Sequence, residues 1–289
     1  MTLVTAMASV VLEPGQTCDP SRYLREKKAK KFLGLQDALA VVAAGQALEA
    51  AGLWGTLPAE RTGLYVAVGY IPAALRDFLP VLEGSLDAEG RFSLERFAAD
   101  GYMRAHPLLA FRCLPNMPAY HVAVSFGIEG PYSVLYPSAG ELYLALDEAC
   151  SALARGEIDV AVVVGVAHQR NFLVEHHFQR VVPPVPVERL RDGGAAFVLE
   201  RDARPGLGPV RARLQALDVR YEPFDCLELV PSHAEELEIE GARHPVDLEI
   251  GPASPLVAVQ GALAAGGGRV VHRLASRDGI RATSEWWAL

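Results

Sequence analysis

The chain has 289 residues, 51% of them hydrophobic, and it carries a formal net charge of −8 at pH 7. This length and apolar content suffice for a sizeable core, either in one large domain or in two fused halves. The acidic balance argues against a nucleic-acid partner, because nucleic-acid binding requires a basic surface. No apolar run reaches the roughly 18 residues that indicate a membrane-spanning helix.

The start of the chain and its cysteines indicate a cellular compartment. The N-terminal residues lack the basic region that opens a signal peptide, so we expect none. Four cysteines (Cys18, Cys113, Cys150 and Cys226) are scattered without C-x-x-C spacing. This pattern fits reduced thiols better than a disulfide framework or a zinc site. We therefore expect a cytoplasmic protein without a metal site.

Strands and helices alternate from the N-terminus. The apolar residues 1–15 predict a first strand, and residues 13–33 are polar, with six basic side chains. This basic segment fits either a solvated loop and helix start or a contact for an acidic partner. The spacing of Ala and Leu predicts a helix over 35–53. A buried strand is expected over 61–71 and a short helix over 73–83.

The stretch from Gly130 to Ala167 predicts a strand, a tight corner, a helix and a buried strand. Residues 133–136 are a short β-rich run, and Pro-Ser-Ala-Gly at 137–140 makes the corner. Apolar residues then recur at helical spacing from Glu141, and Gly156 is suited to cap the helix C-terminus. The almost wholly apolar residues 159–167 indicate a strand that is buried on both faces. A corner of this kind is where α/β sheets place their chemistry.

Shorter elements are expected in the remaining residues. The pattern predicts a turn at 191–194 that enters a strand, strands over 209–221 and 246–251, a helix over 254–265, and a closing hairpin of 268–275 and 282–287 around residues 277–279.

Three blocks of sequence carry a family resemblance. Residues 115–131 (PNMPAYHVAVSFGIEGP), 154–167 (ARGEIDVAVVVGVA) and 193–200 (GGAAFVLE) resemble, in order and spacing, the N-terminal half of a β-ketoacyl synthase of the thiolase superfamily. The resemblance extends weakly over 35–71 and only in fragments beyond Glu200. It implies a layered αβαβα fold with a thiolase-like N-terminal half, residues 1–205, and a reduced C-terminal half, residues 206–289.

The same resemblance argues against catalysis by this chain alone. The position of the family's catalytic cysteine falls on Ala139, and Pro252 stands where the family has its second catalytic histidine. His233 is a loose candidate for the first histidine. An alanine cannot form the thiolate that accepts an acyl chain, and a proline donates no proton. Residues 138–141, Ser-Ala-Gly-Glu, resemble instead the short chain-length-factor-like proteins, which are inactive relatives that pair with an active synthase in type II polyketide and aryl-polyene pathways.

Ser138 has two interpretations. It lies at a strand-to-helix corner like a nucleophile elbow, so it could serve an acyltransferase or hydrolase. However, Tyr136 occupies the first glycine position of the G-x-S-x-G pattern. The favoured interpretation is that Ser138 caps the helix and that Glu141, three residues later, completes a capping box.

The resemblance also implies partners. In the family, the strand equivalent to 132–136 pairs across the dimer axis, and the helix that starts here at Asn116 reaches the partner's acyl pocket. An active ketosynthase is therefore the expected partner, in a heterodimer. A protein that self-associates and holds acyl chains or carrier proteins is an alternative. The side chains expected at the tunnel or interface, unless they only pack in the core, are Met117, Tyr120, Phe126, Tyr132 and Tyr136.

The family resemblance implies a specific role for the basic segment, residues 13–33. An acyl carrier protein is acidic, so the exposed cations of residues 13–33 are candidates to dock it. No cofactor of the chain's own is expected, because the carrier protein presents the phosphopantetheine. The proposed docking residues are Arg25, Lys27, Lys28, Lys30 and Lys31.

Overall fold

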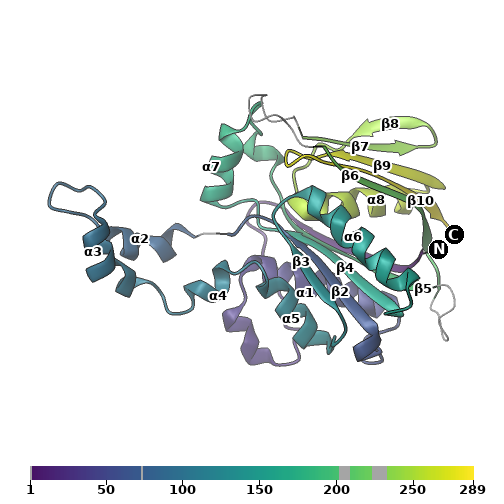
Figure 1. The fold of residues 1–289 in the computed structure, drawn as a ribbon, viewed down its shortest axis with the longest axis horizontal. Coiled ribbons are helices and arrows are strands. Elements are labelled where there is room, and N and C mark those ends of the chain that lie inside the picture. Colours follow the sequence, from purple (N-terminus) through teal and green to yellow (C-terminus); the bar gives the residue numbers. More distant parts are fainter. Residues whose placement is uncertain (1, 73, 202–208, 223–232) are drawn as a thin grey trace.

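The strands form one mixed ten-stranded sheet in the computed structural model, which describes residues 2–72, 74–201, 209–222 and 233–289 (Figure 1). Its spatial order is β3-β2-β4-β5-β1-β6-β10-β9-β7-β8. β2 pairs in parallel with β3 and β4, and the other pairs are antiparallel. The strands are β1 (Thr2–Leu12), β2 (Thr62–Val68), β3 (Tyr132–Leu135), β4 (Val160–Ala167), β5 (Asp192–Arg201), β6 (Ala212–Tyr221), β7 (Ala234–Ile239), β8 (Ala242–Pro245), β9 (Arg269–Ala275) and β10 (Ile280–Ala288).

Helices pack on both faces of the first half of the sheet. Val162 and Val164 of β4 belong to a core cluster with Leu39 of α1, whereas Ala161 and Val163 pack with Leu146 of α6. This alternation explains why β4 is apolar at every position. The helices are α1 (Leu35–Ala50), α2 (Leu75–Gly84), α3 (Leu94–Ala99), α4 (Leu109–Cys113), α5 (Met117–Phe126), α6 (Ala139–Ala154), α7 (Phe172–Arg180) and α8 (Ser254–Ala264).

The second half of the sheet has one covered face and one polar face. Residues alternate along β10 between buried and partly exposed, and the buried ones, such as Trp286, share a core cluster with α6 and α8. The opposite face carries cross-strand ion pairs. Arg269 contacts Glu238 at 3.3 Å and Glu285 at 2.9 Å, and Arg273 contacts Glu238 at 2.8 Å. These charges suit a sheet surface that faces water.

Most predicted elements are present, with shifted ends. The long helix ends at Ala50 rather than Leu53, and the strand expected over 61–71 spans Thr62–Val68. The strand predicted over 246–251 is wrong, because only Glu249 forms an isolated bridge there, with Leu190. The hairpin of β7 and β8 was not predicted. Helix α7 was not predicted either.

Helices α2 and α3 extend away from the body of the molecule (Figure 1). We call residues 75–113, from α2 to the end of α4, the arm. Its large apolar side chains are unusually exposed, with Leu94 at 72% and Met103 at 74%. No helix in the described ranges is both long and apolar enough to cross a bilayer.

Candidate functional site

The corner between β3 and α6 has the predicted geometry. Ser138 is the N-cap of α6, and the backbone N–H of Ser138 donates to the Glu141 carboxylate at 3.0 Å, which completes the capping box. Ala139 is the first helical residue and is buried. Gly140 permits a close approach, because a Cβ there would lie 2.8 Å from both Ile280 Cβ and Ser276 Oγ. The start of α6 is thus pressed against the turn between β9 and β10.

A small cavity lies beneath this corner. Its volume of about 30 Å³ has room for about two water molecules. We call it the corner cavity. It is lined by Tyr70, Pro137, Ser138, Ala139, Gln169, Phe178, His233, Glu249, Gly251, Ser276 and Arg277. The structure therefore brings Ser138, Ala139 and His233, three of the predicted site residues, to one place.

His233 is held in the corner cavity by carboxylates. Its Nε2 atom lies 3.6 Å from Glu235 and 4.0 Å from Glu249. Burial opposes a charge on the ring, but contact with Glu235 and the charge of Glu249 outweigh it and raise the pKa of His233. Glu235 is fully buried, and its two histidine partners hold its pKa below the usual value despite that burial. The pair can thus place a positive imidazolium at the cavity wall. The residues just before His233, 223–232, lie outside the described part of the chain.

A buried polar network extends behind His233. The second carboxylate oxygen of Glu235 is 2.8 Å from Nε2 of His272, and the other ring nitrogen, Nδ1, hydrogen-bonds the Tyr143 hydroxyl. Tyr143 is in turn 3.0 Å from the Ser284 hydroxyl. Apolar periodicity does not predict this network, because its members come from α6, β7, β9 and β10, which are far apart in the chain.

Pro252 lies in a short turn just before α8, as the resemblance implied. Residues 251–253 form a 3-10 turn, and Gly251 lines the corner cavity. The turn packs closely on β4, since a Cβ at Gly165 would lie 2.2 Å from the Pro252 carbonyl oxygen.

Two aromatic side chains, Tyr70 and Phe178, line the corner cavity. Tyr70 packs edge-on against Phe178 of α7 with ring centroids 6.2 Å apart, and it contacts Tyr136 at the same distance. The Arg277 guanidinium lies over the Phe178 ring at 5.5 Å. Tyr136, predicted at an interface, therefore packs against Tyr70, which lines the corner cavity.

The Ser138 hydroxyl contacts two carboxyl groups. Its Oγ is 2.6 Å from Oε2 of Glu141, and it also hydrogen-bonds Asp278. Burial raises the pKa of Glu141 to about 7, and the nearby Asp278 adds to this rise. Within the described part of the chain, no histidine hydrogen-bonds Ser138, as a general base for a nucleophile would.

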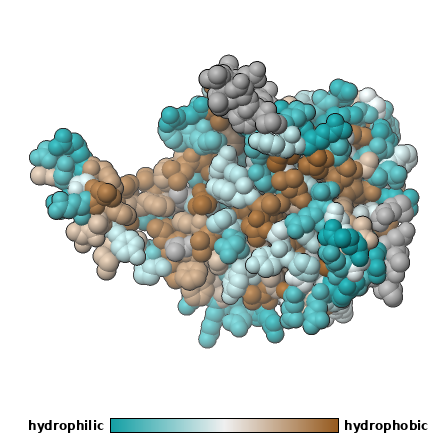
Figure 2. All heavy atoms as spheres, in the orientation of Figure 1, coloured by the Kyte–Doolittle hydropathy of each residue, from teal (hydrophilic) through white to brown (hydrophobic). Residues whose placement is uncertain are grey.

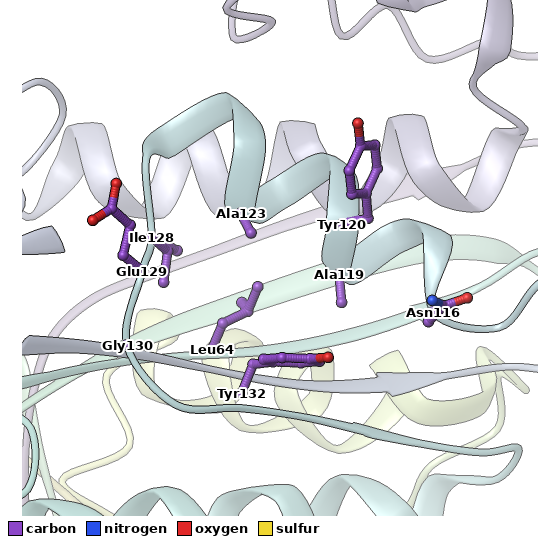
Figure 3. A pocket seen from close by; sticks show the side chains of 9 residues that line it. All are labelled: Leu64, Asn116, Ala119, Tyr120, Ala123, Ile128, Glu129, Gly130 and Tyr132. Carbon is purple, nitrogen blue, oxygen red and sulfur yellow. The ribbon is translucent and has the colours of Figure 1, made fainter. Parts of the chain in front are cut away.

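A groove runs along the edge of the sheet beside β3 (Figure 3). It has a volume of about 390 Å³ and is lined by Leu64, Asn116, Ala119, Tyr120, Ala123, Ile128, Glu129, Gly130 and Tyr132. We call it the edge groove. Tyr120 and Tyr132, both predicted at an interface, line it and are 54% and 71% exposed.

The other predicted interface residues lie elsewhere. Met117 is buried, and Phe126 packs in the core beside Tyr23 with ring centroids 6.3 Å apart. The basic segment forms a 3-10 helix, Lys27–Phe32, with no buried residue. Lys30 there pairs with Asp19 at 2.9 Å. The proposed docking side chains Arg25, Lys27, Lys28, Lys30 and Lys31 are all exposed.

Comparisons with known proteins agree with this architecture. The family model "Beta-ketoacyl synthase, N-terminal domain" matches residues 4–180. The fold is similar to a type II polyketide ketosynthase solved with its acyl carrier protein and a bound hexaketide (AntDE:AntF), at 13% identity and a TM-score of 0.73, over 100% of this chain and 99% of that one. A comparison with curated protein sequences gave no match.

Two further structures match over the same shares of both chains. They are the ishigamide ketosynthase/chain length factor, at 16% identity and a TM-score of 0.64, and a β-ketoacyl synthase from Burkholderia phymatum STM815, at 14% and 0.61. At these identities the likeness shows the fold, and the predicted thiolase-like α/β class is confirmed. The predicted boundary between the halves, at residue 205, lies outside the described residues. Because the family model covers more than half of its length, the chain belongs to the β-ketoacyl synthase family.

Proposed function

We propose that the chain is a non-catalytic, chain-length-factor-like subunit that pairs with an active β-ketoacyl synthase. The observation that carries this proposal is Ala139, which is buried in the first turn of α6 at the strand-to-helix corner. Its methyl group cannot form the thiolate that attacks an acyl thioester. In this proposal the partner subunit, and not this chain, accepts and transfers the acyl group.

The surroundings of Ala139 support the same conclusion. A condensing site needs imidazoles that support decarboxylation and polarise the thioester carbonyl. Pro252 offers no such group, and His233 lies among carboxylates. The corner cavity of about 30 Å³ has space for water rather than for an acyl chain.

The surface beside β3 fits a partner subunit. β3 is the last strand at one end of the sheet, so one of its edges is left without a neighbouring strand in the described part of the chain. An exposed edge of this kind pairs readily with a strand of another chain. Most of the exposed large apolar side chains lie between residues 75 and 144, on the arm, α5, β3 and α6. Figure 2 shows apolar surface running from the arm into the body.

The structural neighbours suggest what such a pair does. One was solved as a ketosynthase with its acyl carrier protein, and another is a ketosynthase/chain length factor. By analogy, we assign the elongation of a carrier-bound chain to the pair, in polyketide or polyene biosynthesis. The exposed cations at residues 25–31 would dock the carrier, and side-chain volume beside the edge groove would limit the chain length.

A substitution in the edge groove tests the pairing. We expect Tyr132→Arg to prevent co-purification with the active ketosynthase encoded nearby, because it places a charge where the β3 edge would be buried. Tyr221→Arg is the matched control, since Tyr221 is 68% exposed and lies on β6. Size-exclusion chromatography with intact-mass analysis reports the complex.

The same experiment separates the alternatives. Equal complex formation by both variants would contradict pairing through β3. A stable homodimer that ignores every ketosynthase would favour the self-associating binding protein. Acylation of Ser138 in the isolated chain would favour the acyltransferase or hydrolase.

A further inference from the structure

The Ser138 hydroxyl lies between a carboxyl group on α6 and one on the β9–β10 turn. It contacts Oε2 of Glu141 and Oδ2 of Asp278, and it accepts a hydrogen bond from the Gly140 N–H at 3.2 Å. A hydroxyl carries a single proton, so it can donate to only one of the two carboxyl oxygens. The other contact needs a hydrogen of its own. That hydrogen must belong to one of the two carboxyl groups.

The surroundings favour this shared proton. Burial and the neighbouring Asp278 raise the pKa of Glu141 to about 7, as expected for two carboxyl groups in one site. The nearest cation on the turn, Arg277, lies over Phe178 rather than beside Asp278. Arg220 is paired with Asp218 at 2.9 Å. The other titratable or charged groups that face this site are Tyr70, Tyr136, Asp147, Tyr221 and Arg281, and Arg281 is paired with Glu222 at 3.2 Å.

These contacts tie the turn 276–279 to the start of α6. Two side chains of the turn, Ser276 and Arg277, line the corner cavity. Ser276 Oγ and Arg277 Nε are buried, and neither has a hydrogen-bond partner in the described structure. The Asp278 contact is thus the side-chain hydrogen bond that joins this turn to α6. On its other side the turn is joined to β6, because the Glu222 N–H donates to the Gly279 carbonyl at 2.8 Å. Loss of the Asp278 contact would therefore free only the side of the turn that faces α6.

We propose that Ser138, Glu141 and Asp278 form a proton-dependent latch that holds the turn 276–279 closed over the corner cavity. With the shared proton present, every close oxygen pair has a hydrogen between its atoms. When the proton leaves, one hydroxyl faces two carboxylates, and the two negative charges repel each other. The turn then opens and exposes the cavity that lies under Ala139.

Hydrogen exchange of the turn amides tests the latch. We expect exchange at residues 276–281 of the wild type, corrected for the intrinsic effect of pH, to rise roughly tenfold between pH 7 and pH 8. Asp278→Asn should remove this rise, because the Asn amide donates to Ser138 Oγ without a titratable proton. Glu148→Gln is the control, since Glu148 is an exposed carboxylate on the same helix that does not line this site.

Thermal unfolding gives an independent reading. The pKa of Glu141 is raised from its usual value of 4.5 to about 7. The protonated Glu141 therefore stabilises the folded protein fully below pH 4.5, and this contribution is lost as the pH rises through about 7. The wild type should therefore lose melting temperature from pH 5 to pH 8 relative to Asp278→Asn. Equal slopes, or a corrected exchange rate in the wild type that does not change with pH, would overturn the latch. Neither measurement requires a partner protein, so a failure of the latch would leave the proposed function untouched, and the reverse also holds.

Discussion

Ala139 and His233 show which site residues a sequence can locate. Ala139 was placed at the corner by counting from Gly130-Pro131, and this works because a strand, a turn and a helix start are local structures. His233 could only be suggested. Its partners Glu235 and Glu249 come from β7 and from the segment before α8, and only tertiary packing brings them to Ala139. The contact of Ser138 with Asp278, 140 positions later, could not be predicted from the sequence for the same reason.

Gly165 tests whether the turn at Pro252 is held by close backbone packing. A Cβ at this position would lie 2.2 Å from the Pro252 carbonyl oxygen, so either β4 or the turn must shift. We expect Gly165→Ala to lower the free energy of unfolding by about 1–3 kcal/mol, as overpacking does. Chemical denaturation would measure the loss.

Gly261 is the matched control for this substitution. It lies within α8 and has open space where a Cβ would be placed. Gly261→Ala should therefore stabilise the protein, by up to about 1 kcal/mol. Equal effects of the two substitutions would contradict the close packing of the turn on β4.

At the scale of elements, apolar periodicity predicted the helices and strands that form the core. β4 was predicted because its residues are apolar on both faces, and α6 because Leu142, Leu146 and Leu153 share one face. The β7–β8 hairpin was missed because its outward residues are charged. Glu236, Glu238 and Arg243 make ion pairs across strands. Apolar periodicity does not predict such pairs, because their partners lie on other strands.

The amphipathic character of α6 leads to a stability prediction. Leu146 is 1% exposed and belongs to the core cluster in which α6 and α8 pack against the sheet, so Leu146→Ala should cost about 2–5 kcal/mol of unfolding free energy. Leu144 is 40% exposed on the same helix. Leu144→Ala should change stability by less than about 0.5 kcal/mol. A similar loss for both variants, measured by urea denaturation, would show that α6 does not fill the core as described.

At the scale of the whole molecule, the two ends of the sheet present different surfaces. The β3 end and the arm expose Tyr, Leu and Phe side chains, whereas the outer face of β9 and β10 is covered by ion pairs. Large exposed apolar surfaces mark sites of interaction. This asymmetry places the expected subunit contact at the β3 end. It could not be foreseen from composition, because apolar residues occur throughout the sequence.

The central claim is that the chain contributes to elongation without a nucleophile of its own. The most direct measurement is elongation of a malonyl-loaded acyl carrier protein by the active ketosynthase encoded nearby, with and without this chain, followed by intact-mass analysis of every protein. We predict products only when both chains are present, with the acyl group on the ketosynthase and never on this chain. Full elongation by the ketosynthase alone, or an acyl group attached to this chain, would contradict the account.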